Sequence, residues 1–540
     1  MNATHEHESD YIVVGGGTAG CILAARLSED PRTKVTLIEA GPRDSSPKVH
    51  VPIGFSRLLN DRALNWCLKT EPQDQLHGRR IDWPRGKVLG GSSSINGMIW
   101  VRGDDRDFDD WASIIEDDRW SWQNVQRHFE KLEAGDDAMD DRIGRSGKIG
   151  LESTEVRNGA VDAFLSAAKE SGLPHLTDLG ISDRVGAGPY LLTRRNGRRV
   201  SSAGAYLKEA RTRENLRILT RATVSQVLFD DGNVATGVRA GHRGASIDLK
   251  CRRGVILAAG AIGSPHLLML SGIGPAAQLG KHGIPVRLDA SEVGQNLRDH
   301  YGVRVVTRIK PQITINSDFR RPWRLARYVL QYALHRTGPL SVGGAYAGAF
   351  FSPEAAVRPS MQALFLPLSM KGPGWNFHPF SAVTCNVYQL RPKSVGALTL
   401  ASPDPSAAPL LDPNYLSAPE DRAALVSGVR SVRDLLSSPA FVGAMESREF
   451  LPGPDVRTDD EILDFARSMG STVFHPVGTC RMGADPGAVV SPEGQVRGTR
   501  NLWVGDASIM PTIPSGNTNA ASAMIAEQLS EFVRGIRVNR

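Results

Sequence analysis

The sequence predicts an α/β fold with a buried parallel sheet, together with a second domain that contributes further strands. The N-terminal stretch "DYIVVGGGTAGCILAARLSEDPRTKVTLIEAG" reads as strand, glycine-rich turn, helix and strand. Further along, "SAVTCNVYQL" and "GALTL" are strand-like, and the proline-rich "ASPDPSAAPLLDP" separates elements. At 540 residues the chain exceeds the usual size of one hydrophobic core, so we expect two domains.

Composition and charge exclude several classes of protein. Hydrophobic residues make up 41% and charged residues 23% of the chain, and no stretch approaches the roughly 20 uncharged apolar residues of a membrane span. The N-terminus "MNATHEHESD" is polar and acidic, so no secretory signal is expected. Five widely spaced cysteines without a C-x-x-C predict neither disulfides nor a metal site, and they favour the cytoplasm.

The net charge of +6 is spread over 64 basic and 58 acidic residues. The densest basic run is "RRNGRR" at residues 194–199. It has no interleaved aromatic residues, and no nucleic-acid-binding motif surrounds it. We therefore expect a solvated loop there and no nucleic-acid partner.

Three glycines of the N-terminal segment carry the first indication of a ligand. Gly15, Gly17 and Gly20 match G-x-G-x-x-G between the expected strand at 11–14 and the helix after it. Such glycines allow a tight turn, close approach of the backbone to a pyrophosphate, and close packing of helix on strand. Glu39 ends the second strand, where an acid accepts hydrogen bonds from ribose hydroxyls and disfavours a 2′-phosphate. The pattern predicts an ADP-containing dinucleotide and leaves FAD and NAD open.

Five further blocks occur in a fixed order along the chain: "RGKVLGGSSSINGMIWVRG" (85–103), "GAIGSPHLLMLSGIG" (260–274), "VGQNLRDH" (293–300), "FHPVGTCRMG" (474–483) and "NLWVGDASIMPTIPSGNTNAASAMIAEQ" (501–528). Together with the N-terminal motif they resemble the glucose–methanol–choline (GMC) oxidoreductases over essentially the whole chain. The resemblance implies the GMC fold, with an α/β Rossmann-like FAD-binding domain and an α+β substrate domain that is built on an antiparallel sheet. The FAD-binding domain would comprise 1–155, 190–310 and 455–540, and the substrate domain 156–189 and 311–454.

The resemblance also implies which residues line the cofactor. They are Gly15, Gly17, Thr18, Ala19, Gly20, Glu39, Ala40, Val88, Gly90, Gly91, Asn96, Met98, Val224, Asp506, Ala507 and Asn519. Asn96 would lie near the isoalloxazine, Val224 by the adenine, and Asp506 near the ribityl or pyrophosphate groups. Without the family, Val224 would be an ordinary core residue of a strand and Asp506 a helix cap. Some relatives attach FAD through a histidine just before the asparagine; this chain has Ile95 there, so non-covalent FAD is expected.

His475 occupies the position of the family's catalytic histidine, and Asn517 that of its partner, which is His or Asn. Oxidation of an alcohol by hydride transfer requires a base for the hydroxyl proton, and imidazole suits that role near neutral pH. An amide can orient the substrate oxygen but cannot act as the base. A histidine before proline is by itself more often structural, and the surrounding blocks reverse that balance. We assign His266 and His300 to structure, and Cys480 to buried packing.

Val473 and Phe474 precede the histidine, so the pocket wall is expected to be apolar and partly aromatic. Where many relatives carry a glutamate this chain has Tyr346, which weakens the case for choline. The predicted function is FAD-dependent oxidation of a primary alcohol to an aldehyde, with molecular oxygen or another electron acceptor taking the electrons. The alternatives are a lyase that cleaves hydroxynitriles on the same fold, a flavin-binding protein without catalysis, and an NAD-dependent dehydrogenase.

Overall fold

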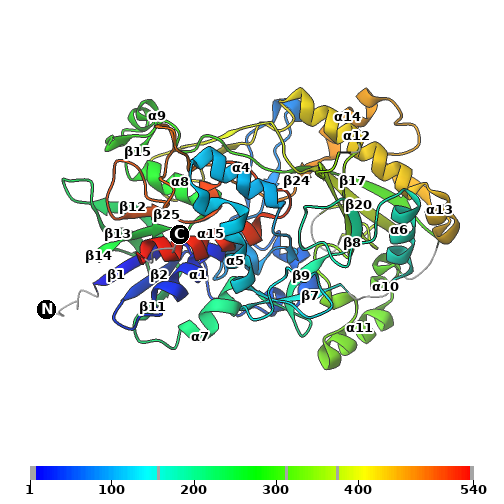
Figure 1. Ribbon diagram of the computed structural model, residues 1–540, viewed down its shortest axis with the longest axis horizontal. Coiled ribbons are helices and arrows are strands. Elements are labelled where there is room, and N and C mark those ends of the chain that lie inside the picture. The colour runs from blue at the N-terminus through cyan, green and yellow to red at the C-terminus, as the bar shows by residue number, and fades with distance from the viewer. Residues whose placement is uncertain (1–7, 155–157, 311–313, 355, 373–375, 536–540) are drawn as a thin grey trace.

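The computed structural model describes residues 8–154, 158–310, 314–354, 356–372 and 376–535. Two sheets stand at opposite ends of the long axis, and helices pack between and around them (Figure 1). The polar, acidic N-terminal segment, in which no secretory signal is expected, falls largely on residues 1–7, outside the described part. The expected domain limits at 155 and 311 also fall at undescribed residues, and the domain boundaries stay a prediction.

The first sheet has the strand order β11-β2-β1-β14-β13-β12, with β25 paired to β14. Its strands are β1 (Ser9–Val14), β2 (Val35–Glu39), β11 (Leu216–Thr220), β12 (Ala222–Phe229), β13 (Ala235–His242), β14 (Ala245–Leu257) and β25 (Leu502–Val504). All residues of β1 and β2 are buried, as in parallel strands that are covered on both faces. Helices α1 (Thr18–Leu27) and α15 (Thr518–Val533) pack together beside this sheet. The expected strand, turn, helix and strand at the N-terminus are thus confirmed.

The second sheet is antiparallel and has the order β23-β17-β20-β19-β18-β8, with β24 paired to β17. Its strands are β8 (Gly186–Pro189), β17 (Tyr301–Arg308), β18 (Ala347–Phe351), β19 (Met361–Leu366), β20 (Ala382–Gln389), β23 (Arg448–Leu451) and β24 (Ser471–Thr472). Helices α6 (Gly159–Glu170) and α12 (Pro419–Leu436) contact these strands. The fold class is therefore the predicted α/β domain with an antiparallel partner, although β17 lies within the range 190–310 that was assigned to the first domain.

The pairings of β17 with β24 and with β20 bring distant parts of the chain to one place. In the register of β24 on β17, Thr472 faces Tyr301 and Ser471 faces Gly302. On the other side of β17, Gly302 faces Tyr388 of β20. The loop after β24 and the residue before β17 therefore meet, which places His475 beside the end of the "VGQNLRDH" block.

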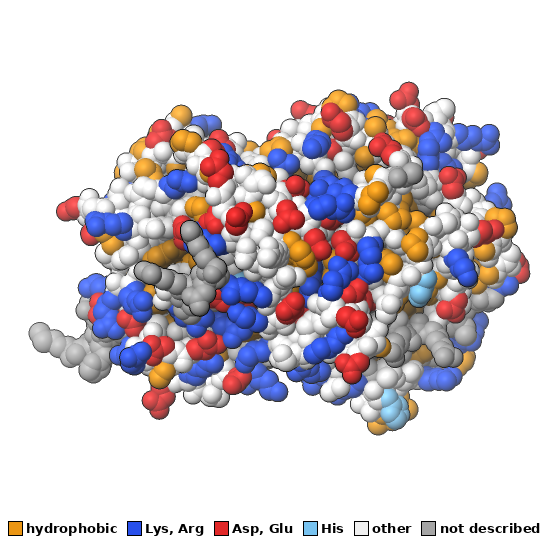
Figure 2. All heavy atoms as spheres, viewed as in Figure 1, with side chains coloured by type: hydrophobic (Ala, Val, Ile, Leu, Met, Phe, Trp, Pro, Cys, Tyr) orange, Lys and Arg blue, Asp and Glu red, His pale blue; other side chains and the backbone are white. Residues whose placement is uncertain are grey.

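The basic run at 194–199 is a hairpin and not the expected solvated loop. β9 (Leu191–Arg195) pairs with β10 (Arg198–Arg199), and Asn196 and Gly197 between them both have positive φ angles, of 50° and 67°. Asn-Gly is the preferred sequence for such a two-residue turn. Across the face drawn in Figure 2, basic and acidic side chains are interspersed.

All five cysteines are free, and each except Cys67 is buried. Burial raises the pKa of the Cys480 thiol well above its usual range, consistent with packing rather than nucleophilic chemistry. None of the described helices combines the length and apolar character needed to cross a bilayer.

Candidate active site and cofactor cradle

His475 lies in the loop after β24 and is held at its backbone and at both ring nitrogens. Its backbone N–H donates to Asp299 Oδ1 over 2.7 Å. Its Nδ1 lies 3.0 Å from Nδ1 of His300, and its Nε2 lies 3.0 Å from Nδ2 of Asn517. The preceding residue, Phe474, has a φ of 72°, a left-handed conformation that bulky residues rarely adopt. The loop is thus shaped to present one ring in one orientation.

The contact between the two histidines fixes their tautomers. His300 Nε2 lies 2.8 Å from the carbonyl oxygen of Leu390, which can only accept, so this nitrogen carries the hydrogen. Burial lowers the pKa of His300 to about 4, so the ring is neutral and its Nδ1 has a free lone pair. His475 must then donate from Nδ1, which leaves a lone pair on its Nε2.

Electrostatics keep His475 uncharged. Burial is the main cause that lowers the pKa of His475 well below its usual range, and the nearby His300 and Arg85 add to it. Arg85 donates from Nη2 to the carbonyl oxygen of Phe474 over 2.8 Å, so its positive charge stays close to the ring. A neutral imidazole with an unprotonated Nε2 is a competent proton acceptor at neutral pH.

Asn517 caps the start of α15 and supplies the second polar group of the site. Its Nδ2 faces the His475 lone pair, while its Oδ1 is buried and has no partner among the described residues. Buried polar atoms usually have a partner. A hydroxyl group bound beside Nε2 of His475 would supply one.

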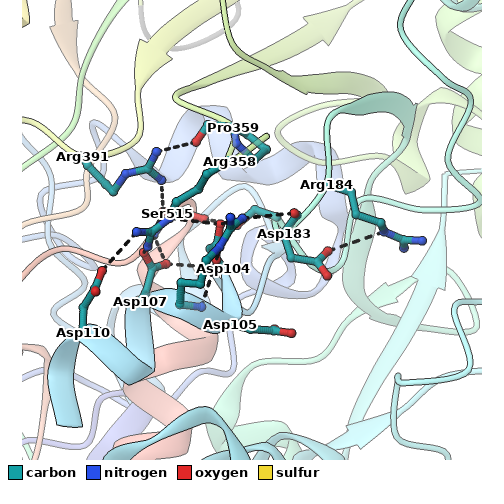
Figure 3. Close-up of polar contacts among 12 residues, drawn as sticks. Asp104, Asp105, Asp107, Asp110, Asp183, Arg184, Arg358, Pro359, Arg391 and Ser515 are labelled. Atoms are coloured by element: carbon teal, nitrogen blue, oxygen red, sulfur yellow. Dashed lines mark hydrogen bonds and ion pairs between the residues drawn. The ribbon is translucent and has the colours of Figure 1, made fainter. Parts of the chain in front are cut away.

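A charged network anchors the segment that carries Asn517 (Figure 3). Asp107, in the first turn of α4 (Asp105–Ile115), accepts from the backbone N–H and the hydroxyl of Ser515, over 2.6 and 2.8 Å. Arg358 donates to Asp107 over 2.7 Å, and Arg391 donates to the Ser515 hydroxyl over 2.8 Å. Ser515, two residues before Asn517, is therefore tied to α4. It is also connected to the loop between β18 and β19, which carries Arg358, and to the loop after β20, which carries Arg391.

In the glycine-rich turn, Gly15 and Gly20 have no room for a side chain, whereas Gly17 does. A Cβ on Gly15 would lie 2.5 Å from the Ala258 carbonyl oxygen, and one on Gly20 would lie 1.8 Å from that of Gly15. On Gly17 it would meet nothing closer than 3.8 Å. Gly15 and Gly20 are thus required by packing, whereas Gly17 borders free space at the N-terminus of α1, where anions bind.

Glu39 and the second glycine-rich block border the same turn. The Glu39 carboxylate accepts from the N–H of Gly16 over 2.8 Å and of Gly41 over 2.7 Å, one at each oxygen. Burial raises its pKa to about 7 despite these donors. The Gly90 N–H donates to the Gly16 carbonyl oxygen over 2.6 Å, so both predicted cofactor blocks lie in contact.

Comparison with known proteins decides the family. Residues 9–302 and 392–526 match the N-terminal and C-terminal families described as GMC oxidoreductase. This chain is a GMC oxidoreductase. It is 41% identical over 529 residues to an alcohol dehydrogenase [acceptor] of Pseudomonas putida, covering 97% of this chain and 95% of that one. It is 38% identical over 531 residues to an oxygen-dependent choline dehydrogenase of Brucella canis, covering 98% and 96%. The crystal structure of pyridoxine 4-oxidase from Mesorbium loti superimposes with a TM-score of 0.87 at 31% identity, covering 98% of this chain and 100% of that one.

As a GMC oxidoreductase the chain is an FAD-dependent enzyme that acts on CH–OH groups, and the residues of the cradle fit that cofactor. Each Glu39 oxygen has only one protein donor, so each retains a lone pair for a ribose hydroxyl. The open side of Gly17 leaves room for a pyrophosphate. Half of the predicted FAD residues are only half-buried and can offer atoms to a ligand: Gly15, Gly17, Thr18, Ala40, Asn96, Val224, Ala507 and Asn519.

Other predicted FAD residues of the GMC enzyme have protein partners of their own. Asp506 accepts from the Gly260 N–H and the Ser264 hydroxyl, and it caps the short helix η7 (Ala507–Ile509). Thr18 donates to Asn519 over 2.8 Å, which ties α15 to the glycine-rich turn. Ala19 and Gly20 lie inside α1 and are buried. Gly91 and Met98, which lie outside that helix, are buried too. Val88 is buried in an apolar cluster with Ile95, so only its backbone can face a ligand.

Sequence reasoning missed three residues that support the catalytic pair. His300 was assigned to structure, yet its ring nitrogen touches that of His475. Asp299 holds the His475 backbone and also accepts from Thr472 over 2.5 Å. Asp107 was not singled out at all. The "RDH" end of the block at 293–300 was the only available signal for the first two, because the pairing of β24 with β17 has no pattern of its own.

The predicted substrate wall gains further members in the structure. Val473 packs against an apolar cluster that includes Tyr346 and Met98, and Phe474 is half-buried. The Tyr346 hydroxyl is buried and has no partner among the described residues.

Proposed function

We propose that the chain oxidises an uncharged primary alcohol to an aldehyde, with non-covalently bound FAD as the hydride acceptor. The observation that carries the proposal is the arrangement of His475, whose unprotonated Nε2 lies 3.0 Å from Nδ2 of Asn517, an amide whose Oδ1 has no partner among the described residues. The relatives named as alcohol dehydrogenase and choline dehydrogenase support a CH–OH substrate.

The protein side of the reaction follows from these groups. The substrate hydroxyl replaces the Nδ2–H of Asn517 as the donor to Nε2 of His475, which accepts its proton as the alkoxide develops. Asn517 orients the substrate oxygen, and the fixed charge of Arg85 stabilises negative charge nearby. FAD, when bound, supplies the hydride acceptor at N5 and passes the electrons to oxygen or another acceptor. Ile95 supports non-covalent attachment, because its side chain has no nucleophile and packs in an apolar cluster.

The apolar wall of Val473, Phe474 and Met98 favours benzylic, furanic or aliphatic alcohols over choline. The test is an anaerobic scan of the flavin absorption of the purified protein against a panel of primary alcohols that includes choline. Bleaching by an uncharged alcohol, and not by choline, is the expected result. Readmitting air then measures how fast oxygen reoxidises the flavin. A yellow protein that no alcohol bleaches would contradict the proposal and favour a hydroxynitrile-cleaving lyase.

A further inference from the structure

Helix α11 (Pro322–His335) presents apolar side chains to solvent along the line that faces away from the protein. The exposed fractions are 61% for Trp323, 59% for Leu330 and 67% for Leu334, and Val329 is 52% exposed. Of the eleven exposed large hydrophobic residues among those described, these four lie on this one helix. Figure 1 shows α11 at the lower right margin of the molecule.

The inner side of α11 is anchored, so this exposure is not that of a loose segment. Tyr332 is buried and donates from its hydroxyl to the Gly197 carbonyl oxygen over 3.1 Å. Tyr328 and Arg324 both bind Asp318 of the preceding helix α10 (Ile315–Phe319). Trp323, Leu330 and Leu334 are spaced by seven and four residues, so they share one face, opposite Tyr332. A surface helix normally turns a polar face outward, whereas α11 carries apolar side chains on its outer face as well as on its inner one.

Arginines flank this apolar line. Arg321, Arg327 and Arg336 are exposed on or beside α11, and the hairpin of the basic run adds exposed Arg195 and Arg198 next to its C-terminal end. Within the described ranges, none of these five arginines has a carboxylate within ion-pair distance. The guanidinium of Arg336 instead lies over the Tyr332 ring, 5.2 Å from its centroid. The patch thus combines apolar side chains with unneutralised positive charge.

We propose that this patch, α11 with the 195–198 hairpin turn, docks on the surface of an anionic lipid bilayer. Trp and Leu on one helix face with arginines around them is the composition of an interfacial helix. A second copy of the chain fits less well, because a two-fold contact would set the arginines against each other. The helix offers four exposed apolar side chains, whereas a stable protein interface involves roughly 20–30 residues on each side.

Docking in this way would bring the substrate wall near the membrane. Phe319, at the end of α10, packs both on the cluster that contains Tyr346 and on the one that contains Tyr332. α11 is therefore a direct neighbour of the wall that also includes Val473. Docking through α11 would therefore place the cluster that includes Val473 close to the bilayer, where an apolar alcohol would be concentrated. This last step rests on the proposed function, and the docking itself does not.

The test is flotation of the purified holoenzyme with vesicles of phosphatidylcholine alone or of an equal mixture with phosphatidylglycerol. Binding to the mixed vesicles only, weakened by high salt, is the expected result. The triple variant W323S/L330S/L334S should lower the partition coefficient at least about tenfold. R195Q/R198Q/R327Q should also weaken binding. The matched control V286S/V357S/M469S removes exposed apolar side chains elsewhere and should bind like the unmodified enzyme.

Three outcomes would overturn the proposal. They are unmodified enzyme that stays with the non-floating fraction, a serine triple variant that floats as well as the unmodified enzyme, and an oligomer in solution that the serine substitutions dissociate. Because the substituted side chains are exposed, flavin reduction by a water-soluble alcohol should be unchanged in every variant. A loss of docking with full activity separates this proposal from the proposed function.

Discussion

At the residue scale, the site depends on one proton position that a second histidine sets. The Leu390 carbonyl fixes the His300 tautomer, and His300 in turn fixes that of His475. Neither step needs a carboxylate, so the pair stays neutral while it is buried. The proposed base, His475, thus has a neutral imidazole as its partner instead of a carboxylate that would raise its pKa.

Substitution H300F should lower the rate of flavin reduction about tenfold, which corresponds to the roughly 1–3 kcal/mol cost of an unpaired buried group. The phenylalanine cannot accept from Nδ1 of His475, so the ring loses its tautomer control. Stopped-flow reduction with a fixed alcohol measures the effect. Y388F is the control, because the Tyr388 ring lies near both imidazoles, tilted to that of His300 and edge-on to that of His475, while its hydroxyl donates to Gln362. Equal rates for H300F and the unmodified enzyme would remove His300 from the account.

The pH dependence follows from the sign of the His475 shift. The reaction needs neutral His475, and burial with the nearby His300 and Arg85 lowers its pKa well below its usual range. The kcat/KM should therefore be constant through neutral pH and fall only well below about pH 6.5. R85Q removes a positive charge and should move this acid limb to higher pH, whereas R85K should not. An acid limb above pH 7 in the unmodified enzyme would contradict the assignment.

At the element scale, two glycines of the glycine-rich turn are expected to have different roles, Gly20 in packing and Gly17 in contact with the cofactor. A Cβ at Gly20 collides with backbone, whereas one at Gly17 enters open space. G17A should therefore fold with a nearly unchanged melting temperature but bind FAD more weakly, by about tenfold or more, because a methyl group occupies the pyrophosphate side. G20A should lower the melting temperature itself. Titration of the apoprotein with FAD and thermal unfolding measure the two effects, and unchanged FAD affinity in G17A would place the cofactor elsewhere.

The α4 network is the second test at this scale. D107A leaves the Ser515 N–H without its buried acceptor and removes one of the three carboxylates that bind Arg358, so a loss of about 1–3 kcal/mol of stability is expected. D110A removes another partner of the same arginine, but Asp110 is 58% exposed, so about 0–1 kcal/mol is expected. Denaturant unfolding of both variants measures the difference. Equal stability of the two variants would show that the network does not anchor the segment of Asn517.

At the scale of the whole molecule, the sequence predicted what is local and missed what depends on register. The turn of Gly15, Gly17 and Gly20 is written in consecutive residues, so its spacing predicted the strand, helix and second strand. The contact of His300 with His475 depends on β24, whose two residues are too few to show an alternating pattern. The contact of Asp107 with Ser515 joins residues about four hundred positions apart, which no spacing reveals.

The structure of the basic run at 194–199 was also not predictable from its composition. Its composition indicated a loop, whereas the Asn-Gly pair within it closes a hairpin. Its position next to α11 could not be foreseen, because that contact joins the hairpin to a helix more than a hundred residues later. The membrane-facing patch exists only in the folded molecule.

The central claim is that His475 accepts the substrate proton, and the most direct test is the rate of anaerobic flavin reduction in H475A with the best alcohol of the panel. The variant should remain folded and yellow, since the FAD cradle lies on other segments, and its reduction rate should fall by about 10²-fold or more. A reduction rate close to that of the unmodified enzyme would contradict the account.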